Sequence, residues 1–271
     1  MSKFNKLAVV IAAAVASFAA HAEFTIDDFS AKQATLTDNT VDNSGFYSRI
    51  ENSGILGGSR TIFVERKGGD ADDGDASGNV SAGVNNGKYS YSTATGGTGT
   101  GYIRWDGSAG VVGATAASEA SFASALNKTG LGAFDLNAQG SQFRLKVLKS
   151  DLGFPFVIEA YTDATHWSRM TLFALAGFSD RTVTFSDFGG AAGQNGTVLP
   201  SGALLSTGAD GAVDFAKLGA LQAIINPAAF YENSIDLQID YAGSIPEPTS
   251  LALVGLALVG LGVARRQKAV K

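Results

Sequence analysis

The chain has 271 residues, 45% of them hydrophobic, which is ample for one domain with a sizeable core. Its net charge is −5, and residues 23–245 hold 14 basic against 24 acidic side chains, so we expect no nucleic-acid partner because such a surface repels phosphates. The absence of cysteine excludes disulfides, thiolate nucleophiles and Cys-ligated zinc or iron–sulfur sites.

The first predicted element is a secretory signal peptide over residues 1–22. A basic start, an apolar run too short to span a bilayer stably and an A-x-A cleavage site carry this prediction: Lys3 and Lys6, residues 7–20, Ala20 and Ala22. We expect export through the Sec machinery and cleavage by signal peptidase, which leaves Glu23 as the new N-terminus. An uncleaved N-terminal anchor is the alternative.

Residues 23–244 predict one all-β extracytoplasmic domain, an antiparallel jelly-roll-like β-sandwich. Apolar and polar residues alternate over short runs that end at Gly, Asn or Asp, as in half-buried strands. The predicted strands are residues 60–65, 88–92, 101–105, 142–148, 156–162, 168–176, 181–188 and 234–241. Only residues 116–126 and 214–220 are predicted as short helical turns, and the Gly/Thr-rich stretch 93–101 is predicted as a flexible loop.

An acidic stretch, residues 70–79, is a speculative Ca²⁺ site because calcium takes six to eight oxygen ligands from a flexible loop. Its candidate ligands are Asp70, Asp72, Asp73 and Asp75. The stretch does not follow the EF-hand pattern, since Asp75 stands at the sixth position, where that loop needs glycine. A solvated acidic turn without metal is the favoured interpretation, and no other cofactor is expected.

Aromatic residues of the middle region form a speculative carbohydrate-binding set, because each offers an apolar face to a sugar ring and a polar group beside it. The set is Tyr89, Tyr91, Trp105, Tyr161 and Trp167, with Tyr102 as a further member. Asp106, Asp163 and Arg169 lie near them in sequence and are candidates to bond hydroxyl groups. The favoured alternative is that both tryptophans are ordinary core or edge residues.

No catalytic motif supports an enzyme. After signal removal His166 is the remaining histidine, and no serine lies in a G-x-S-x-G turn, so neither a hydrolase triad nor a multi-histidine metal centre is expected. A pair of carboxylates on different strands leaves no linear motif, so a glycan hydrolase or lyase stays open as the alternative.

Two groups of short stretches resemble jelly-roll domains of the galactose-binding type. The first is Asp27-Asp28-Phe29 with Gly57-Gly58-Ser59-Arg60. The second is Val213-Asp214-Phe215, Leu218-Gly219-Ala220 and Ile235-Asp236-Leu237. The resemblance implies a fold and no particular ligand.

The C-terminal segment, residues 245–271, has three parts: Pro246-Glu247-Pro248, an apolar run over residues 251–264, and a basic end with Arg265 and Arg266. The run predicts a short transmembrane helix, and the basic end stays cytoplasmic. This order resembles the PEP-CTERM sorting signal. The resemblance implies recognition by exosortase, a membrane transpeptidase-like cysteine protease of Gram-negative exopolysaccharide producers, and cleavage near Pro246–Pro248. A plain C-terminal membrane anchor is the alternative.

The sequence as a whole predicts a non-enzymatic protein exported across the inner membrane to the cell envelope, surface or extracellular matrix. A C-terminal membrane anchor is retained or transient. The expected partner of the domain is exopolysaccharide. Besides the hydrolase or lyase, a structural surface protein that assembles through strand edges remains an alternative.

Overall fold

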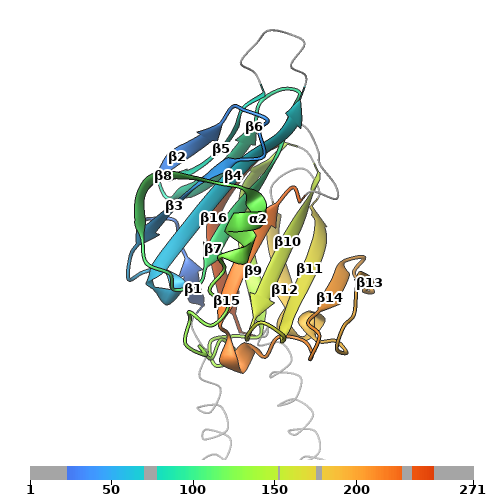
Figure 1. Ribbon diagram of the computed structural model, residues 1–271. Helices are drawn as coiled ribbons and strands as arrows, with labels where there is room; N and C mark the ends of the chain where they lie inside the picture. The colour runs from blue at the N-terminus through green and yellow to red at the C-terminus, as the bar shows by residue number, and fades with distance from the viewer. Residues whose placement is uncertain (1–22, 70–77, 152, 175–178, 228–233, 247–271) are drawn as a thin grey trace, which may run out of the picture.

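The computed structural model describes residues 23–69, 78–151, 153–174, 179–227 and 234–246. Two antiparallel sheets pack face to face around a shared core (Figure 1). The expected all-β antiparallel sandwich is therefore confirmed.

The smaller sheet, sheet A, has the order β12-β9-β16-β6-β5-β2, and β1 also pairs with β16. Its strands are β1 (Phe24–Asp27), β2 (Gln33–Asp38), β5 (Val80–Asn85), β6 (Lys88–Thr93), β9 (Gln142–Ser150), β12 (Ser179–Thr184) and β16 (Asp236–Ile245). The first and last strands of the described chain are thus hydrogen-bonded neighbours.

The larger sheet, sheet B, has the order β13-β14-β11-β10-β15-β7-β4-β3-β8. Its strands are β3 (Gly45–Glu51), β4 (Ser59–Gly69), β7 (Gly97–Trp105), β8 (Val111–Ala117), β10 (Phe154–Tyr161), β11 (Trp167–Ala174), β13 (Thr197–Val198), β14 (Leu204–Thr207) and β15 (Ala220–Ile225). Among the described residues the one α-helix is α2 (Glu119–Ser124), and 3-10 turns are η1 (Leu56–Gly58), η3 (Phe185–Phe188) and η4 (Phe215–Lys217).

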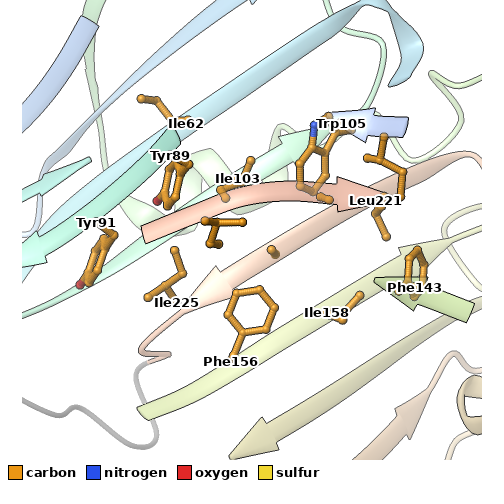
Figure 2. Packing of buried hydrophobic residues seen from close by; sticks show 14 of the residues in the cluster. Ile62, Tyr89, Tyr91, Ile103, Trp105, Phe143, Phe156, Ile158, Leu221 and Ile225 are labelled. Carbon is orange, nitrogen blue, oxygen red and sulfur yellow. The ribbon is translucent and has the colours of Figure 1, made fainter. Parts of the chain in front are cut away.

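The core lies between the sheets and is rich in aromatic rings. Figure 2 shows Tyr89, Tyr91 and Trp105 pointing into the same layer as Phe143 and Phe156. Full burial of one large apolar side chain stabilises a fold by roughly 1.5–3 kcal/mol. Packing therefore carries the stability of a chain that has no disulfide.

The Gly/Thr-rich stretch 93–101 is not the flexible loop that the composition indicates, because β7 begins at Gly97. Its glycines leave room for the tyrosine rings of β6. A Cβ atom on Gly101 would lie 2.7 Å from the ring of Tyr91, whose hydroxyl donates to the carbonyl oxygen of Gly99 at 2.8 Å. The glycines here make a strand that accepts large neighbours.

A buried ion pair joins the two sheets. Arg60 of β4 donates to both carboxylate oxygens of Asp27 at the end of β1, at 2.9 Å each, and both side chains are fully buried. The indole nitrogen of Trp105 donates to the same carboxylate at 3.0 Å. Arg60 also donates to the side chain of Gln33 and to the carbonyl oxygen of Ala31, so most hydrogen-bonding atoms of the buried pair have partners.

Most predicted elements are confirmed, since each predicted strand falls on an observed one. The strand predicted over residues 181–188 is wrong in its second half, because β12 ends at Thr184 and Phe185–Phe188 form the 3-10 turn η3. That turn brings Phe185 and Phe188 into one aromatic group with Phe215, at ring distances of 4.4 and 5.4 Å. The predicted helical turns appear in shortened form as α2 and η4.

Both ends of the described chain lie at one end of the sandwich, the lower end in Figure 1. Phe24 pairs with Ser244, and the hydroxyl of Tyr241 donates to the carbonyl oxygen of Phe24 at 3.1 Å. The side chain of Glu23 forms an ion pair with Arg144 at 2.9 Å.

Several predicted segments lie outside the described residues: the signal peptide with Ala20 and Ala22, the acidic aspartates 70–75, and residues 247–271 with Glu247, Pro248, Arg265 and Arg266. Within the described ranges, no helix has the length and apolar character needed to cross a bilayer.

Candidate ligand-binding face

The expected carbohydrate-binding aromatics separate into a buried group and an outward-facing pair. Tyr89, Tyr91 and Trp105 belong to the core between the sheets and are at most 3% exposed, so their assignment as sugar platforms is wrong. The alternation that placed them on strands also places them on the inner face, where the indole of Trp105 bonds Asp27.

Tyr161 and Trp167 do come together, on the outer face of sheet B. They are register partners on β10 and β11, and their rings lie 6.3 Å apart. Tyr161 is largely buried at 9% exposure, whereas Trp167 is partly exposed. The ammonium of Lys128 lies 5.4 Å from the Tyr161 ring, within cation–π range.

A polar row crosses the outer face of sheet B next to this pair. Its members are register partners on successive strands and project to the side opposite the core. In order, they are Arg49, Thr61, Arg104, Gln222, Glu159, Arg169 and Ser206. Seven strands thus contribute one continuous line of hydrogen-bonding side chains to the outer face of sheet B.

Glu159 is the most heavily bonded member of the polar row. It accepts from the Tyr161 hydroxyl at 2.8 Å and from the amide of Gln222, and it pairs with Arg169 at 3.2 Å. Burial, with the nearby Glu159 charge as a second cause, raises the pKa of Tyr161, so its hydroxyl remains a donor. Arg169 is 39% exposed and is the row's charged contact with solvent in this region.

Helix α2 covers the other half of the same face (Figure 1). Phe122 stacks on Phe63 of β4 at 4.5 Å and meets Tyr102 of β7 edge-on at 5.4 Å. Glu119 accepts from the Tyr102 hydroxyl at 2.6 Å and pairs with Lys67 at 2.8 Å. The helix is therefore fixed by one apolar and one charged contact group.

Arg104 lies beneath this helix and is fully buried. Its guanidinium sits 3.8 Å from the Phe122 ring centre and donates to the Phe122 carbonyl at 3.0 Å and to Gln222 at 3.1 Å. Its Nη2 atom has no hydrogen-bond partner among the described residues. Burial lowers the pKa of Arg104 to about 10, because desolvation disfavours its charge.

The uncovered half of the face follows β11. Trp167, Arg169, Thr171 and Phe173 alternate with inward residues on this strand, and successive outward side chains stand roughly 7 Å apart. Phe173 is 50% exposed. Thr171 is buried at 8% exposure, so this half, which we call the β11 face, offers two aromatic rings and a guanidinium in one line, a pattern suited to an extended polar chain with apolar ring faces.

The remaining candidate polar residues are structural. Asp106 is buried and accepts from the backbone nitrogens of Ser108 and Asn127. Asp163 closes the β10–β11 turn by accepting from the backbone nitrogens of His166 and Thr165, at 2.8 Å each, and these bonds lower its pKa to about 2. His166 is partly exposed in that turn, with its Nδ1 atom 3.1 Å from Asp163.

The outer face of sheet A differs because its charges are paired with one another. Arg144 binds Asp180 at 2.6 Å, Lys149 binds Asp236 at 3.2 Å, and Lys146 binds Asp240. All of these side chains are substantially exposed, as on an ordinary solvated surface.

A cavity of about 400 Å³ lies between the sheets, under β9, β12, β10 and β11. Its walls are mainly Phe143, Leu145, Val147, Phe154, Phe156, Ile158, Leu172 and Val183, with Ser150 and Ser201 among the few polar lining residues. Such walls suit an apolar ligand and give a sugar few hydrogen-bond partners. No set of three or more His, Asp or Glu side chains within the described ranges is arranged to hold a metal ion.

Comparison with known proteins identifies the C-terminal signal. Residues 244–267 match the PEP-CTERM protein-sorting motif. No curated protein sequence matches the chain. Among solved structures, the chain is similar to a family 11 carbohydrate-binding module from Clostridium thermocellum, solved in complex with a beta-1,3-1,4-mixed-linked tetrasaccharide. The identity is 12% and the TM-score 0.33, over 83% of this chain and 95% of that one. The chain therefore carries a PEP-CTERM sorting motif, which marks it as an exosortase-targeted protein of the cell envelope or surface.

Proposed function

We propose that this exported protein is a non-enzymatic glycan-binding protein and that the β11 face is its binding surface. The observation that carries the proposal is the partly exposed Trp167, held beside Tyr161 and followed along the strand by Arg169. A sugar ring that stacks on the indole would place its hydroxyl groups near the free guanidinium nitrogens of Arg169.

The Trp167 ring packs in part against the cluster of Leu126, Tyr161 and Ala220 and leaves the rest of its surface to solvent. Trp105 satisfies its indole nitrogen inside the core, whereas among the described residues no hydrogen-bond partner is found for the indole nitrogen of Trp167. Tyr161 and Glu159 fix the floor under Trp167 and Arg169, so the surface is preorganised. Preorganisation reduces the entropy lost when a ligand binds.

The same contacts argue for binding without catalysis. Glu159, the carboxylate of the polar row, is 6% exposed and accepts hydrogen bonds from two side chains besides its ion pair with Arg169. A general acid or base must reach the proton that it transfers. Glu159 instead acts as a fixed anchor for Arg169, whose side chain faces solvent, and for the buried Tyr161 and Gln222.

The setting of this activity follows from the sorting motif and the expected export signals. We propose that the signal peptide is removed before Glu23, that residues 251–264 hold the chain in the membrane until processing, and that the glycan is the exopolysaccharide of the producing cell. The acidic stretch 70–79 is proposed as a solvated turn, with calcium binding as the alternative.

The two tryptophans allow a direct test. We would titrate soluble β-glucan, xylan, alginate and the exopolysaccharide of the producing cells into the mature domain and follow tryptophan emission. The wild type and Trp105→Phe are expected to respond to the bound polymer, and Trp167→Phe is expected to be silent. In affinity gels Trp167→Ala should weaken retention tenfold or more, equivalent to about 1.4 kcal/mol.

Lys146→Ala, on the paired outer face of sheet A, is the matched control and should bind as the wild type does. Equal retention of Trp167→Ala and the wild type would refute the proposed surface. Release of shortened sugars during the titration would instead favour a hydrolase or lyase. Failure of all four polymers to bind would refute glycan binding.

A further inference from the structure

The sorting motif overlaps the folded domain. The match begins at residue 244, and β16 continues to Ile245. Ser244 is fully buried and has neighbours on both sides, Phe24 of β1 and Phe143 of β9. The first residues of the signal are thus part of the interior of sheet A.

Further contacts hold the chain up to Pro246. The backbone nitrogen of Ser141 donates to the carbonyl oxygen of Ile245 at 3.0 Å, and the amide of Gln142 donates to the carbonyl oxygen of Pro246 at 3.4 Å. Gly140 lies so close that a Cβ atom there would collide with the Ser244 hydroxyl and the Ile245 carbonyl. We call Ser244, Ile245 and Pro246 with these contacts the C-terminal clamp.

A protease needs its substrate backbone extended and free of sheet partners, so it cuts a folded protein only where the chain opens locally. By this criterion the peptide bonds between Gly243 and Pro246 are inaccessible to a protease. The proline ring at position 246 also removes a backbone donor that an enzyme would use to hold the substrate.

We propose that the C-terminal clamp restricts cleavage by exosortase to peptide bonds after Pro246. We further propose that it holds the domain close to the membrane during this cleavage. In this step one peptide bond breaks. The released tail leaves with a new amino group, and the domain's new terminal carbonyl carbon takes the oxygen of water or the nucleophilic atom of an acceptor. The inference rests on the sorting motif and not on glycan binding.

The C-terminal clamp also limits how far the folded domain can lie from the membrane. Five residue steps separate Pro246 from Leu251, where the expected membrane run begins, and these span at most about 18 Å. The end of the sandwich with Glu23, Ser141 and Gln142 therefore faces the membrane and the enzyme in it. This end is the expected contact surface for exosortase.

The test is the intact mass of the full-length protein recovered from producing cells. A chain that ends at Pro246 or later but before Leu251, with a free carboxylate or an acceptor attached, supports the proposal. A chain that ends at Gly243, Ser244 or Ile245 overturns it, and so does one that keeps residues 251–271.

A second arm changes the clamp itself. Gly140→Ala pushes on Ser244 and Ile245 and is expected to produce additional chain ends at or before Ile245. Gly189→Ala, whose new methyl group would approach the Ser186 carbonyl only to 3.2 Å, is the control and should give wild-type ends. Wild-type ends in a folded Gly140→Ala variant would overturn the restriction. If that variant does not fold, the wild-type mass still decides.

Discussion

At the scale of single residues, the buried pair of Asp27 and Arg60 is the most consequential contact in the sandwich. Both side chains are completely buried, and Asp27 also accepts from the indole of Trp105 and the backbone nitrogen of Phe29. Removing one partner leaves the other charge buried and unpaired, which costs far more than the intact pair contributes.

We therefore expect Asp27→Ala to lower the free energy of unfolding by about 3–5 kcal/mol in urea denaturation. Asp180→Ala removes an exposed partner of Arg144 and should cost no more than about 1 kcal/mol. A loss for Asp27→Ala as small as that of Asp180→Ala would contradict the importance of burial.

Asp163 supplies a pH prediction. Its pKa is lowered from 3.8 to about 2 by the backbone nitrogens of His166 and Thr165, so the β10–β11 turn favours the charged form. The contribution is fully present above pH 3.8 and is lost as the pH falls through about 2. Chemical shifts of the Thr165 and His166 amides should titrate near pH 2, and Asp163→Asn should abolish that titration; a midpoint near 3.8 would show that the turn is not formed.

The sequence could not show which of the two tryptophans lies in the core and which faces solvent. Trp105 and Trp167 both stand at strand ends beside polar residues, and the same chemistry applies to either. Their different roles come from Asp27, which is 78 positions from Trp105 in sequence, and from the outward register of β11. Only the pairing of distant strands decides which ring faces the core.

At the scale of elements, helix α2 shows how six residues hold a large surface. Phe122 fills the space among Phe63, Tyr102 and the guanidinium of Arg104. We expect Phe122→Ala to lower the free energy of unfolding by about 3–5 kcal/mol, because it leaves a cavity at this site and removes the ring that covers the guanidinium of Arg104. Ser124→Ala on the exposed side of the helix should change it by no more than about 0.5 kcal/mol. Equal effects in chemical denaturation would mean that α2 is not docked.

Strands were predictable from sequence where one face of a sheet meets water, as in β9 and β16. β15 escaped prediction because all six of its residues are buried, by the core on one side and by the α2 region on the other, so its sequence does not alternate. β7 escaped in part because glycines usually interrupt strands. Here they accommodate Tyr91, a partner that lies on the facing sheet.

The edge strand β8 bears on the hypothesis of assembly through strand edges. It has no charged residue, and Val112 is fully exposed, both of which favour pairing with another chain. However, two extra residues bulge between its pairings with Tyr47 and Arg49, and Gly113 there has a φ of 88°. A bulge breaks the regular row of backbone groups that a second strand would need.

At the scale of the whole molecule, the layer architecture and the sorting signal were predictable, and the path of the chain was not. Local alternation identifies strands, but the order in which they pair depends on contacts between residues far apart in sequence. The neighbouring position of β1 and β16 has no local signal, because the residues that carry it, Phe24 and Tyr241, are ordinary core and surface types.

This pairing also sets the order of events during folding. Under the proposed export from the N-terminus, residue 24 crosses the membrane early and residue 244 late, so sheet A remains incomplete until β16 has crossed. Contacts of such sequence separation form slowly, since a long loop must close first. Until then the position of β16 beside β1 is empty and the unfinished sheet can pair wrongly, so we expect the chain to depend on chaperones outside the inner membrane until its last strand arrives.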